Sequence, residues 1–337
     1  MTKTYDVAVL GATGAVGETI LSILVERGFP IGKLYPLGSQ NSEGKVVMFD
    51  NQAHRVLNAA EFDFSLAQIA LFSAGGSVSA MYAPKAADAG CIVIDNTSHF
   101  RYDADVPLVI PEVNPGKIAD YRQRNIIANP NCSTIQMLVA VKPIYDAVGI
   151  TRINVATYQA VSGIGRSGVT ELVGQTAKLL NGEAADPDVF TKQIAFNVLP
   201  QIDLFQDNGY TREEMKMFWE TQKILDDHKI LVNATAVRVP VFYGHSEALH
   251  IETGSKLTAE EARELLRVAP GVILLDDSEY PTAVTHAAAE DAVYVSRVRE
   301  DISHPLGLNL WVVADNIRKG AALNAIQIAE ILIESYL

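Results

Sequence analysis

Cys132 is the residue of this sequence whose surroundings most clearly suggest chemistry. It lies in the polar stretch 129–134 (NPNCST), between a run at 125–128 that predicts a strand and a run at 134–141 that predicts a helix. A cysteine at a helix start meets unpaired backbone N–H groups and the positive end of the helix dipole, which stabilise the nucleophilic thiolate. A lone cysteine is more often a small buried hydrophobe. Its asparagine, serine and threonine neighbours favour a nucleophile instead.

A glycine-rich loop at residues 11–17 (GATGAVG) suggests a dinucleotide site. It directly follows an apolar run at 7–10, and Val16, Ile20, Ile23 and Leu24 then recur at helical spacing. In this strand–loop–helix context, the first glycine permits a tight turn, the second lets the backbone approach a pyrophosphate, and the third lets helix and strand pack closely. The spacing is GxxGxxG rather than GxGxxG, so a plain structural turn remains an alternative.

The residues after the second predicted strand, 34–37, bear on the choice of cofactor. In NAD enzymes an acidic residue at this strand end binds the ribose hydroxyls, and it would repel a 2′-phosphate. Here the strand is followed by 38–42 (GSQNS), and no acidic residue occurs before Glu43. Hydroxyls and amides, with Lys45 nearby, favour NADP.

The composition indicates an ordinary globular protein. The chain has 337 residues, of which 48% are hydrophobic and 20% charged, and its length favours two domains. The net charge of −13 argues against nucleic acid as a partner. No apolar run is long enough to cross a bilayer, and the first residues lack the layout of a secretory signal, so we expect a cytoplasmic protein without a membrane partner. Cys91 and Cys132 are the only cysteines, and no cluster has the spacing of a metal site.

The first third of the sequence alternates buried strands with helices. Runs at 69–72 and 92–94 predict strands, with a helix over 79–89 between them and Cys91 as a buried residue. This alternation is typical of a parallel sheet covered on both faces. The final segment, 321–337, predicts a helix that packs back on this part of the chain.

After Cys132 the apolar runs are longer and alternate with polar residues. These runs, at 153–158, 231–243, 292–298 and 308–313, predict an antiparallel or mixed sheet with one face open to solvent or a partner. Two helices should begin with capping boxes, at Thr211 and Thr258. The predicted fold is therefore α/β: a Rossmann-type dinucleotide-binding domain over 1–131 and 320–337, and an α+β catalytic and dimerisation domain with a mixed sheet over 132–319.

Together with the late run 314–320 (ADNIRKG), the glycine loop and the Cys132 stretch resemble the aspartate-β-semialdehyde dehydrogenases, from the first strand to the last helix. The resemblance implies NADP- and phosphate-dependent interconversion of aspartate semialdehyde and aspartyl phosphate, in biosynthesis of lysine, threonine, methionine and diaminopimelate. It also implies a homodimer or tetramer. Cys132 would form a hemithioacetal and then a thioester, His245 would be the acid/base, and Gln159 would orient the groups beside the thiol. Without the family match, His245 would be interpreted as a residue with a structural role, and Gln159 as an exposed strand residue.

The resemblance also implies the substrate contacts. Arg101 and Lys223 match phosphate-binding residues, Arg238 matches the residue that binds the substrate carboxylate, and Glu220 is expected to meet the amino group. The alternatives are an internal salt bridge for Arg238 and a surface ion pair for Glu220 with Lys223. Such a charge pattern suits an amino-acid phosphate. The implied cofactor contacts are Gly11, Thr13, Gly14, Ala15, Val16, Ser39, Ser42, Ser73, Gly75, Gly163 and Asn316.

One residue departs from the family pattern. The family often has arginine where this chain has Asn41, so discrimination between NADP and NAD should be weaker. Rival interpretations are a reductase acting on N-acetylglutamyl phosphate, a Cys/His hydrolase or acyltransferase, and a catalytically silent paralogue. Glu220 speaks against the first rival, because an acetylated substrate has no ammonium group, and the glycine loop speaks against the second.

Overall fold

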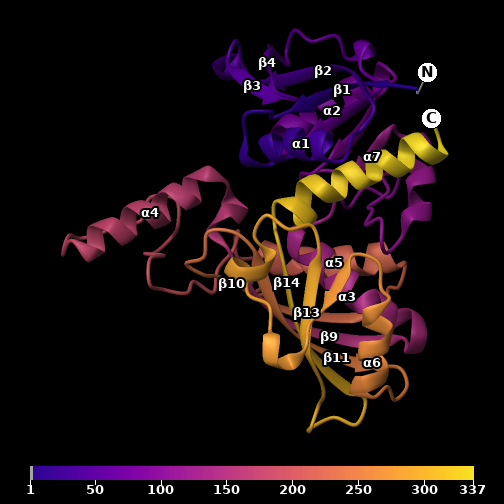
Figure 1. Cartoon of the computed structure of the whole chain (residues 1–337), viewed down its shortest axis with the longest axis vertical. Coiled ribbons are helices and arrows are strands. Elements are labelled where there is room, and N and C mark those ends of the chain that lie inside the picture. The colour runs from indigo at the N-terminus through magenta and orange to yellow at the C-terminus, as the bar shows by residue number, and fades with distance from the viewer. Residues whose placement is uncertain (1–2) are drawn as a thin grey trace. The chain divides into compact units, whose positions relative to one another are not determined.

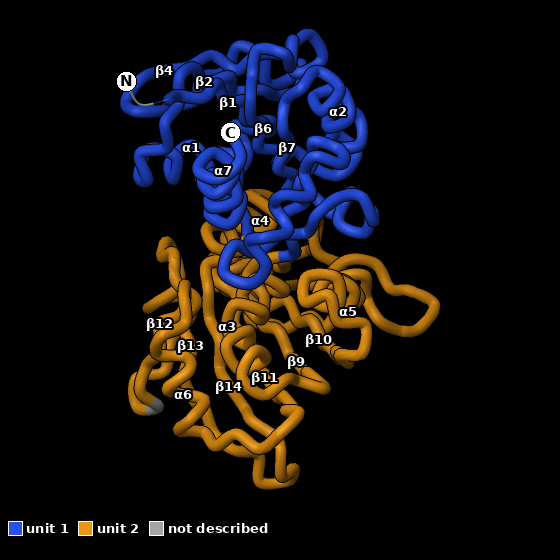
Figure 2. Tube along the Cα trace, turned by 90° about the vertical axis from the view of Figure 1, so that its right-hand side faces the viewer, with its two compact units in different colours: residues 1–131, 321–337 blue, residues 132–320 orange. Residues whose placement is uncertain are grey.

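The computed structural model describes residues 3–337 and divides into two compact units. The first unit comprises Met1–Asn131 with Ala321–Leu337, and the second comprises Cys132–Gly320 (Figure 2). The chain thus passes from the first unit to the second at Cys132 and returns after Gly320.

The first unit is built on a six-stranded parallel sheet, in the order β5-β2-β1-β6-β7-β8. Its strands are β1 (Tyr5–Leu10), β2 (Ile31–Gly38), β5 (Leu57–Asn58), β6 (Ile69–Phe72), β7 (Ile92–Asp95) and β8 (Ile126–Ala128). A separate hairpin is formed by β3 (Val46–Phe49) and β4 (Gln52–Arg55). The helices are α1 (Ala15–Glu26), α2 (Gly76–Asp88) and α7 (Leu323–Ser335), with 3₁₀ turns η1 (Gln40–Ser42), η2 (Phe64–Leu66) and η3 (Pro115–Gln123) (Figure 1).

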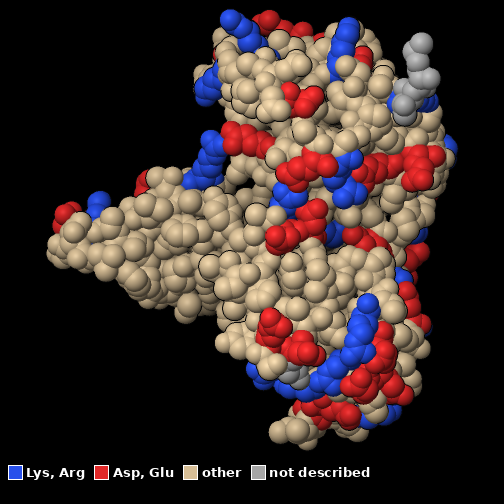
Figure 3. All heavy atoms as spheres, viewed as in Figure 1, with Lys and Arg blue, Asp and Glu red and all other residues tan. Residues whose placement is uncertain are grey.

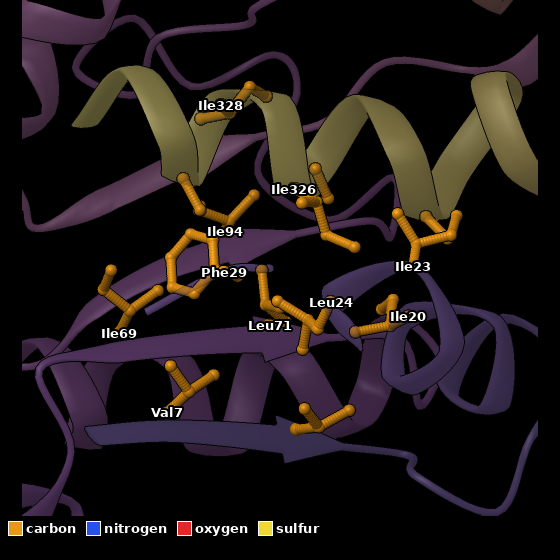
Figure 4. Close-up of a cluster of buried hydrophobic side chains, with 14 of the residues drawn as sticks. Val7, Ile20, Ile23, Leu24, Phe29, Ile69, Leu71, Ile94, Ile326 and Ile328 are labelled. Atoms are coloured by element: carbon orange, nitrogen blue, oxygen red, sulfur yellow. The ribbon is translucent and has the colours of Figure 1, made fainter. Parts of the chain in front are cut away.

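The core of the first unit explains why the last helix belongs to it. Ile326 and Ile328 of α7 pack in one buried cluster with side chains from α1 and from strands β1, β6 and β7 (Figure 4). Burying such aliphatic side chains stabilises the fold by roughly 1.5–3 kcal/mol each. The prediction that the final helix packs on the first domain is confirmed, although the α-helix begins at Leu323, after a π-helical turn η7 (Arg318–Ala322).

The second unit is built on a mixed sheet, in the order β10-β9-β11-β14-β13-β12, in which β10/β9 and β12/β13 pair in parallel. Its strands are β9 (Ile150–Gln159), β10 (Leu231–Arg238), β11 (His245–Thr253), β12 (Val272–Leu274), β13 (Val293–Glu300) and β14 (Gly307–Ala314). The α-helices are α3 (Cys132–Val148), α4 (Arg166–Leu180), α5 (Arg212–Leu225) and α6 (Ala259–Arg267). Shorter turns are η4 (Val161–Ile164), η5 (Asp277–Glu279) and η6 (Ala283–Ala287).

The two sheets confirm the predicted α/β class, a parallel Rossmann-type sheet followed by a mixed one. Both predicted capping boxes are present, at Thr211 before α5 and at Thr258 before α6. The strand predicted over 231–243 is wrong in length, because β10 ends at Arg238. Pro240 has no N–H for a ladder, and the chain then turns through Gly244 with a φ of +87° to start β11. Among the described residues no helix is long and apolar enough to span a membrane.

Candidate active site

Cys132 is the first residue of α3, as the sequence predicts, and its side chain is partly accessible. The helix start supplies partial positive charge beside the sulfur. Backbone from far along the chain also approaches it closely, since a Cβ on Gly320 would lie 2.7 Å from the Cys132 Cβ. Gly320 therefore leaves room for the cysteine, a role that the sequence motif ADNIRKG did not reveal.

Gln159, the last residue of β9, turns its side chain to the buried face of the sheet. Its Nε2 lies 2.9 Å from Ser133 Oγ, 3.3 Å from Thr157 Oγ1 and 3.2 Å from Glu213 Oε1, so its two N–H groups have three acceptors within hydrogen-bonding distance. Ser133 directly follows Cys132, so the amide lies beside the cysteine-bearing turn. Gln159 is buried, which rules out the alternative of an exposed strand residue.

His245, the first residue of β11, is completely buried. Its Nδ1 accepts a hydrogen bond from the Ala160 N–H at 3.1 Å, which assigns the proton of the neutral ring to Nε2. Nε2 is buried and has no hydrogen-bond partner among the described residues. Burial and the charge of Arg238 lower the pKa of His245 to about 3, against the opposing effects of Glu213 and the Gly244 backbone. The ring is thus neutral near pH 7 and offers one free donor.

Arg238, the last residue of β10, lies opposite Gln159 in the parallel register and is also buried. Its Nη1 donates to the Ala160 carbonyl at 2.7 Å. The peptide of Ala160 therefore links Arg238 and His245, and a Cβ on Gly163 would lie 2.7 Å from Nη1. Among the described residues no carboxylate forms an ion pair with Arg238, so the structure does not contain the internal salt bridge considered from the sequence. Burial lowers the pKa of Arg238, while the charges of Glu213 and Cys132 raise it.

Glu220 and Lys223 both lie on α5, one helical turn apart. Glu220 is fully buried and Lys223 is half-buried. A surface ion pair, the alternative from sequence, would leave both groups in solvent. The burial of Glu220 is typical of a carboxylate held for a specific partner.

Asn316, predicted as a cofactor contact, joins the loops of the second unit that surround His245. Its Oδ1 accepts from the Gly244 N–H at 2.9 Å, and its Nδ2 lies 3.1 Å from Ser162 Oγ. Asn316 thus fixes the turn that leads into His245. The preceding Asp315 accepts the N–H groups of Ile317 and Arg318 at 2.7 and 2.9 Å and so caps the π-helical turn that carries Gly320.

The predicted cofactor residues of the first unit gather at the carboxyl ends of neighbouring strands. Residues 11–16 follow β1, Ser39 and Ser42 follow β2, and Ser73 and Gly75 follow β6. Because β1 connects onward to β2 on one side and β6 lies on the other, these loops flank the topological switch point where open α/β sheets bind ligands. Gly11 has a φ of +90°, and a Cβ there would lie 2.9 Å from Ser73 Oγ.

The α1 terminus and the β2 end fit a dinucleotide phosphate. Gly14 is the N-cap residue of α1 and has no side chain to cap the helix, which leaves backbone N–H groups of the first turn available to bind a pyrophosphate. Residues 39–42 carry hydroxyls and amides and no carboxylate, and Asn41 is exposed. These residues therefore suit the 2′-phosphate of NADP, although without a cation at position 41.

Arg101 is buried in the first unit and is anchored on backbone. Its Nε donates to the Asn129 carbonyl and its Nη2 to the Asn96 carbonyl, each at 2.9 Å. These carbonyls follow β8 and β7, so the guanidinium lies at the carboxyl end of the same sheet as the glycine loop.

The described residues contain no cluster of three metal-binding side chains. Acidic groups are spread over the visible surface of both units (Figure 3).

Glu247 is a second fully buried group near His245, two residues further along β11. Neither of its carboxyl oxygens has a hydrogen-bond partner among the described residues. Burial raises the pKa of Glu247 well above its usual value, and a weaker interaction with Gln136 opposes this. Burial therefore favours the protonated form of Glu247 in the folded protein, and sequence patterning gave no sign of this buried carboxyl group.

We expect Glu247→Gln to remove a pH-dependent loss of stability. Above the pKa of an ordinary glutamate the unfolded chain is ionised while the folded protein keeps its proton, so folding takes up a proton and stability falls as pH rises. The slope is about 1.4 kcal/mol of unfolding free energy per pH unit until the folded pKa is passed. Urea unfolding measured from pH 5 to 8 should show that the free energy of unfolding of Glu247→Gln increases relative to that of wild type as the pH rises. A pH-independent difference, or the same gain for Glu252→Gln on the same strand, would contradict this.

Two family models match this chain, one in each of its two units. Residues 6–121 match the family model for the semialdehyde dehydrogenase NAD binding domain, and residues 141–319 match that for the semialdehyde dehydrogenase dimerisation domain. Fold and site thus define a two-domain semialdehyde dehydrogenase.

Individual relatives narrow the class. Aspartate-semialdehyde dehydrogenase of Shewanella sp. (strain DB6705) is 65% identical over 337 residues and aspartate-semialdehyde dehydrogenase 2 of Vibrio cholerae is 62% identical over 336, each covering 100% of both chains. The crystal structure of aspartate semialdehyde dehydrogenase II from Vibrio cholerae complexed with ASA has a TM-score of 0.99 at 62% identity and covers 100% of both chains. The chain belongs to the aspartate-semialdehyde dehydrogenase family, which confirms the resemblance inferred from its motifs.

Proposed function

We propose that this enzyme interconverts L-aspartate 4-semialdehyde and L-4-aspartyl phosphate, with NADP and inorganic phosphate, through a thioester on Cys132. In the biosynthetic direction it would supply the semialdehyde for synthesis of lysine, threonine, methionine and diaminopimelate. The observation that carries the proposal is the cluster in the second unit: Cys132 at a helix start, the amide of Gln159 beside it, and the buried pair His245 and Arg238 joined by one peptide.

The chemistry follows from the groups of this cluster. The Cys132 thiolate, favoured by the helix start and by the charge of Arg238, adds to the aldehyde carbon and forms a hemithioacetal oxyanion. The Nε2–H of His245 donates a hydrogen bond to that oxyanion. The loops of the first unit would hold NADP, which would supply the hydride acceptor needed for oxidation of the hemithioacetal to the thioester. Phosphate then attacks the thioester carbon, the C–S bond breaks, and the thiolate departs from aspartyl phosphate.

The charges in the chain suit this substrate. Arg238 would bind the substrate carboxylate, because it is a buried cation without an ion pair in the described structure. Glu220, also buried, would bind the ammonium group. Arg101 and Lys223 would bind phosphate, and the backbone anchors of Arg101 would hold its guanidinium in place for that task.

We further propose that the enzyme is a homodimer that associates through the second sheet. Helices α3, α5 and α6 pack against this sheet, and the side chains on the opposite face include exposed Tyr158 and Leu231. Tyr158 also lies 5.8 Å from the Trp311 ring, centroid to centroid, so this face carries aromatic surface. The α4 segment of the same unit has few charges on its visible side (Figure 3). Sedimentation equilibrium would test this, and a monomer at micromolar concentration would refute it.

The direct test of the function is NADPH formation from aspartate semialdehyde with and without inorganic phosphate. We expect reaction to depend on phosphate, because phosphate is needed to release the acyl group from the enzyme. Steady turnover that is independent of phosphate would indicate hydrolysis of the thioester and would refute the proposed product. The rival substrate N-acetylglutamate semialdehyde should react poorly, because its acetylated nitrogen is uncharged and cannot form the ion pair that we propose between the substrate ammonium group and Glu220.

Placing arginine at position 41 should increase the preference for NADP. A hydrogen bond to a charged group contributes about 1.5–3 kcal/mol, so the ratio of kcat/KM for NADP over NAD should rise roughly tenfold or more in Asn41→Arg. Gln52→Arg adds the same charge on β4, outside the η1 loop, and serves as control. If wild type already selects NADP strongly and Asn41→Arg leaves the ratio unchanged, the site for the 2′-phosphate lies elsewhere.

A further inference from the structure

Asp95 is a buried carboxylate of the first unit that the proposed chemistry does not use. It is the last residue of β7, its side chain is fully buried, and its strand lies between β6 and β8 in the sheet. Burying an aspartate costs free energy unless its oxygens are hydrogen-bonded. The carboxyl end of this sheet also carries the loops that would bind NADP and phosphate, so Asp95 lies among them.

Three hydrogen-bond donors converge on this carboxylate. Its Oδ1 accepts the Ser79 hydroxyl at 2.8 Å and the Thr97 N–H at 3.0 Å, and its Oδ2 accepts the Thr97 hydroxyl at 2.8 Å. Thr97 Oγ1 in turn accepts the His99 N–H at 3.3 Å. Asp95 therefore joins helix α2, which carries Ser79, to the loop that follows β7.

The same loop holds the guanidinium of Arg101. Arg101 Nη2 donates to the carbonyl of Asn96, the residue after Asp95, and Arg101 Nε donates to the Asn129 carbonyl, each at 2.9 Å. The Asn129 N–H donates to the Asp95 carbonyl at 2.8 Å. Both residues that anchor Arg101 are thus joined to Asp95, one by the peptide bond and the other by a backbone hydrogen bond.

Arg101 and Asp95 influence each other without forming an ion pair. Burial raises the pKa of Asp95, while the hydrogen bonds from Thr97 and Ser79 and the charge of Arg101 oppose this effect. No cation forms an ion pair with Asp95 among the described residues. Asp95 therefore acts on Arg101 mainly through the backbone that it orders. Its negative charge alone would weaken the binding of a nearby anion.

We propose that Asp95 is a positioning residue, which fixes the loop 96–100 so that the Arg101 guanidinium is held in one place for inorganic phosphate. The proposal rests on the function proposed above and adds a residue to it. An aspartate can bind the N–H and the hydroxyl of the residue two positions further on, which fixes a tight turn. This turn keeps the Asn96 carbonyl, and with it one anchor of Arg101, in a single position.

The matched variants Thr97→Val and Thr97→Ser test the hydrogen bond to Asp95. Valine resembles threonine in shape but lacks the hydroxyl, so the turn loses its bond to Asp95 and its acceptor for His99. We expect the KM for inorganic phosphate to rise about five- to tenfold, with the KM for aspartate semialdehyde and for NADP changed less than about twofold. Thr97→Ser keeps the hydroxyl and should stay within about twofold of wild type. A phosphate KM that is the same in both variants would overturn the proposal.

Asp95→Asn separates positioning from simple repulsion of phosphate. If the carboxylate only repelled the anion, its neutralisation would lower the KM for phosphate, whereas loss of the ordered turn should raise it about tenfold. Asp105→Asn removes one charge at an exposed position that pairs with Arg124, and it should leave this KM within about twofold of wild type. A lower or unchanged KM in Asp95→Asn would overturn the proposal. If Asp95→Asn does not fold, the two Thr97 variants decide.

A double-mutant cycle with Arg101→Ala shows whether the effect passes through the guanidinium. In the Arg101→Ala background, Thr97→Val should change the KM for phosphate less than about twofold, because the group that the turn positions is absent. Multiplicative effects of the two substitutions would overturn the positioning role alone. Wild-type turnover that is independent of phosphate, or an unchanged phosphate KM in Arg101→Ala, would refute the proposed function and the positioning role with it.

Discussion

Replacing Cys132 with serine is expected to lower kcat for NADPH formation from aspartate semialdehyde by at least about 10³-fold. Serine keeps the size and the position at the start of α3, but its hydroxyl is a far weaker nucleophile than a thiolate near neutral pH. Because the thioester is the species that phosphate attacks, no acyl phosphate should form. Steady-state assays with saturating phosphate measure the loss directly.

Cys91 provides the matched control for the nucleophile. It is buried directly before β7, and burial raises the pKa of its thiol to about 12, so it stays protonated and unreactive. Cys91→Ala should therefore retain activity. Mass spectrometry after incubation with semialdehyde and NADP, but without phosphate, should detect an acyl adduct on the Cys132 peptide alone. Activity that survives Cys132→Ser, or an adduct on another residue, would contradict the mechanism.

Replacing His245 with alanine is expected to lower kcat by about 10²–10³-fold, the range for removal of one oxyanion donor. The Nδ1 of the ring accepts the Ala160 N–H, so its only proton sits on Nε2, where we propose that it binds the reacting oxygen. A pKa of about 3 keeps the ring neutral at every pH above about 4. The wild-type pH–rate profile between pH 5 and 9 should therefore lack an ionisation due to His245.

The pH profile distinguishes this donor role from general base catalysis. A base with an ordinary histidine pKa would give an acidic limb near pH 6.5 that disappears in His245→Ala. Such a limb would refute the neutral, Nε2-protonated assignment. His228→Ala, at an exposed position after α5, is the control and should keep wild-type kcat at each pH.

Most elements of the fold could be predicted because their signals are local. The run 69–72 coincides with β6, and the threonine–glutamate spacing before α5 and α6 gave two true capping boxes. The strand over 231–243 was predicted too long for a reason that is not local. Apolar alternation continues to Val241, but the backbone there leaves the sheet, and the Val161 and Ser162 N–H groups donate to Val241 and Phe242 instead.

The sequence by itself determined the type of chemistry. Residue types and spacing indicated a cysteine at a helix start, a glycine loop after the first strand, and the set of charged residues that family resemblance then assigned to substrate. These signals can be recognised in the sequence alone, because a helix terminus or a tight turn depends on residues within a few positions of one another.

Only the tertiary structure decided how the side chains cooperate. It paired Arg238 with Gln159 across neighbouring strands, used the Ala160 peptide to orient both Arg238 and His245, and sent Glu213 toward the active-site amide. These contacts join residues about 50 to 85 positions apart. Their partners are set by strand register and helix packing, which bring distant backbone within hydrogen-bonding distance and leave no periodic trace in the sequence.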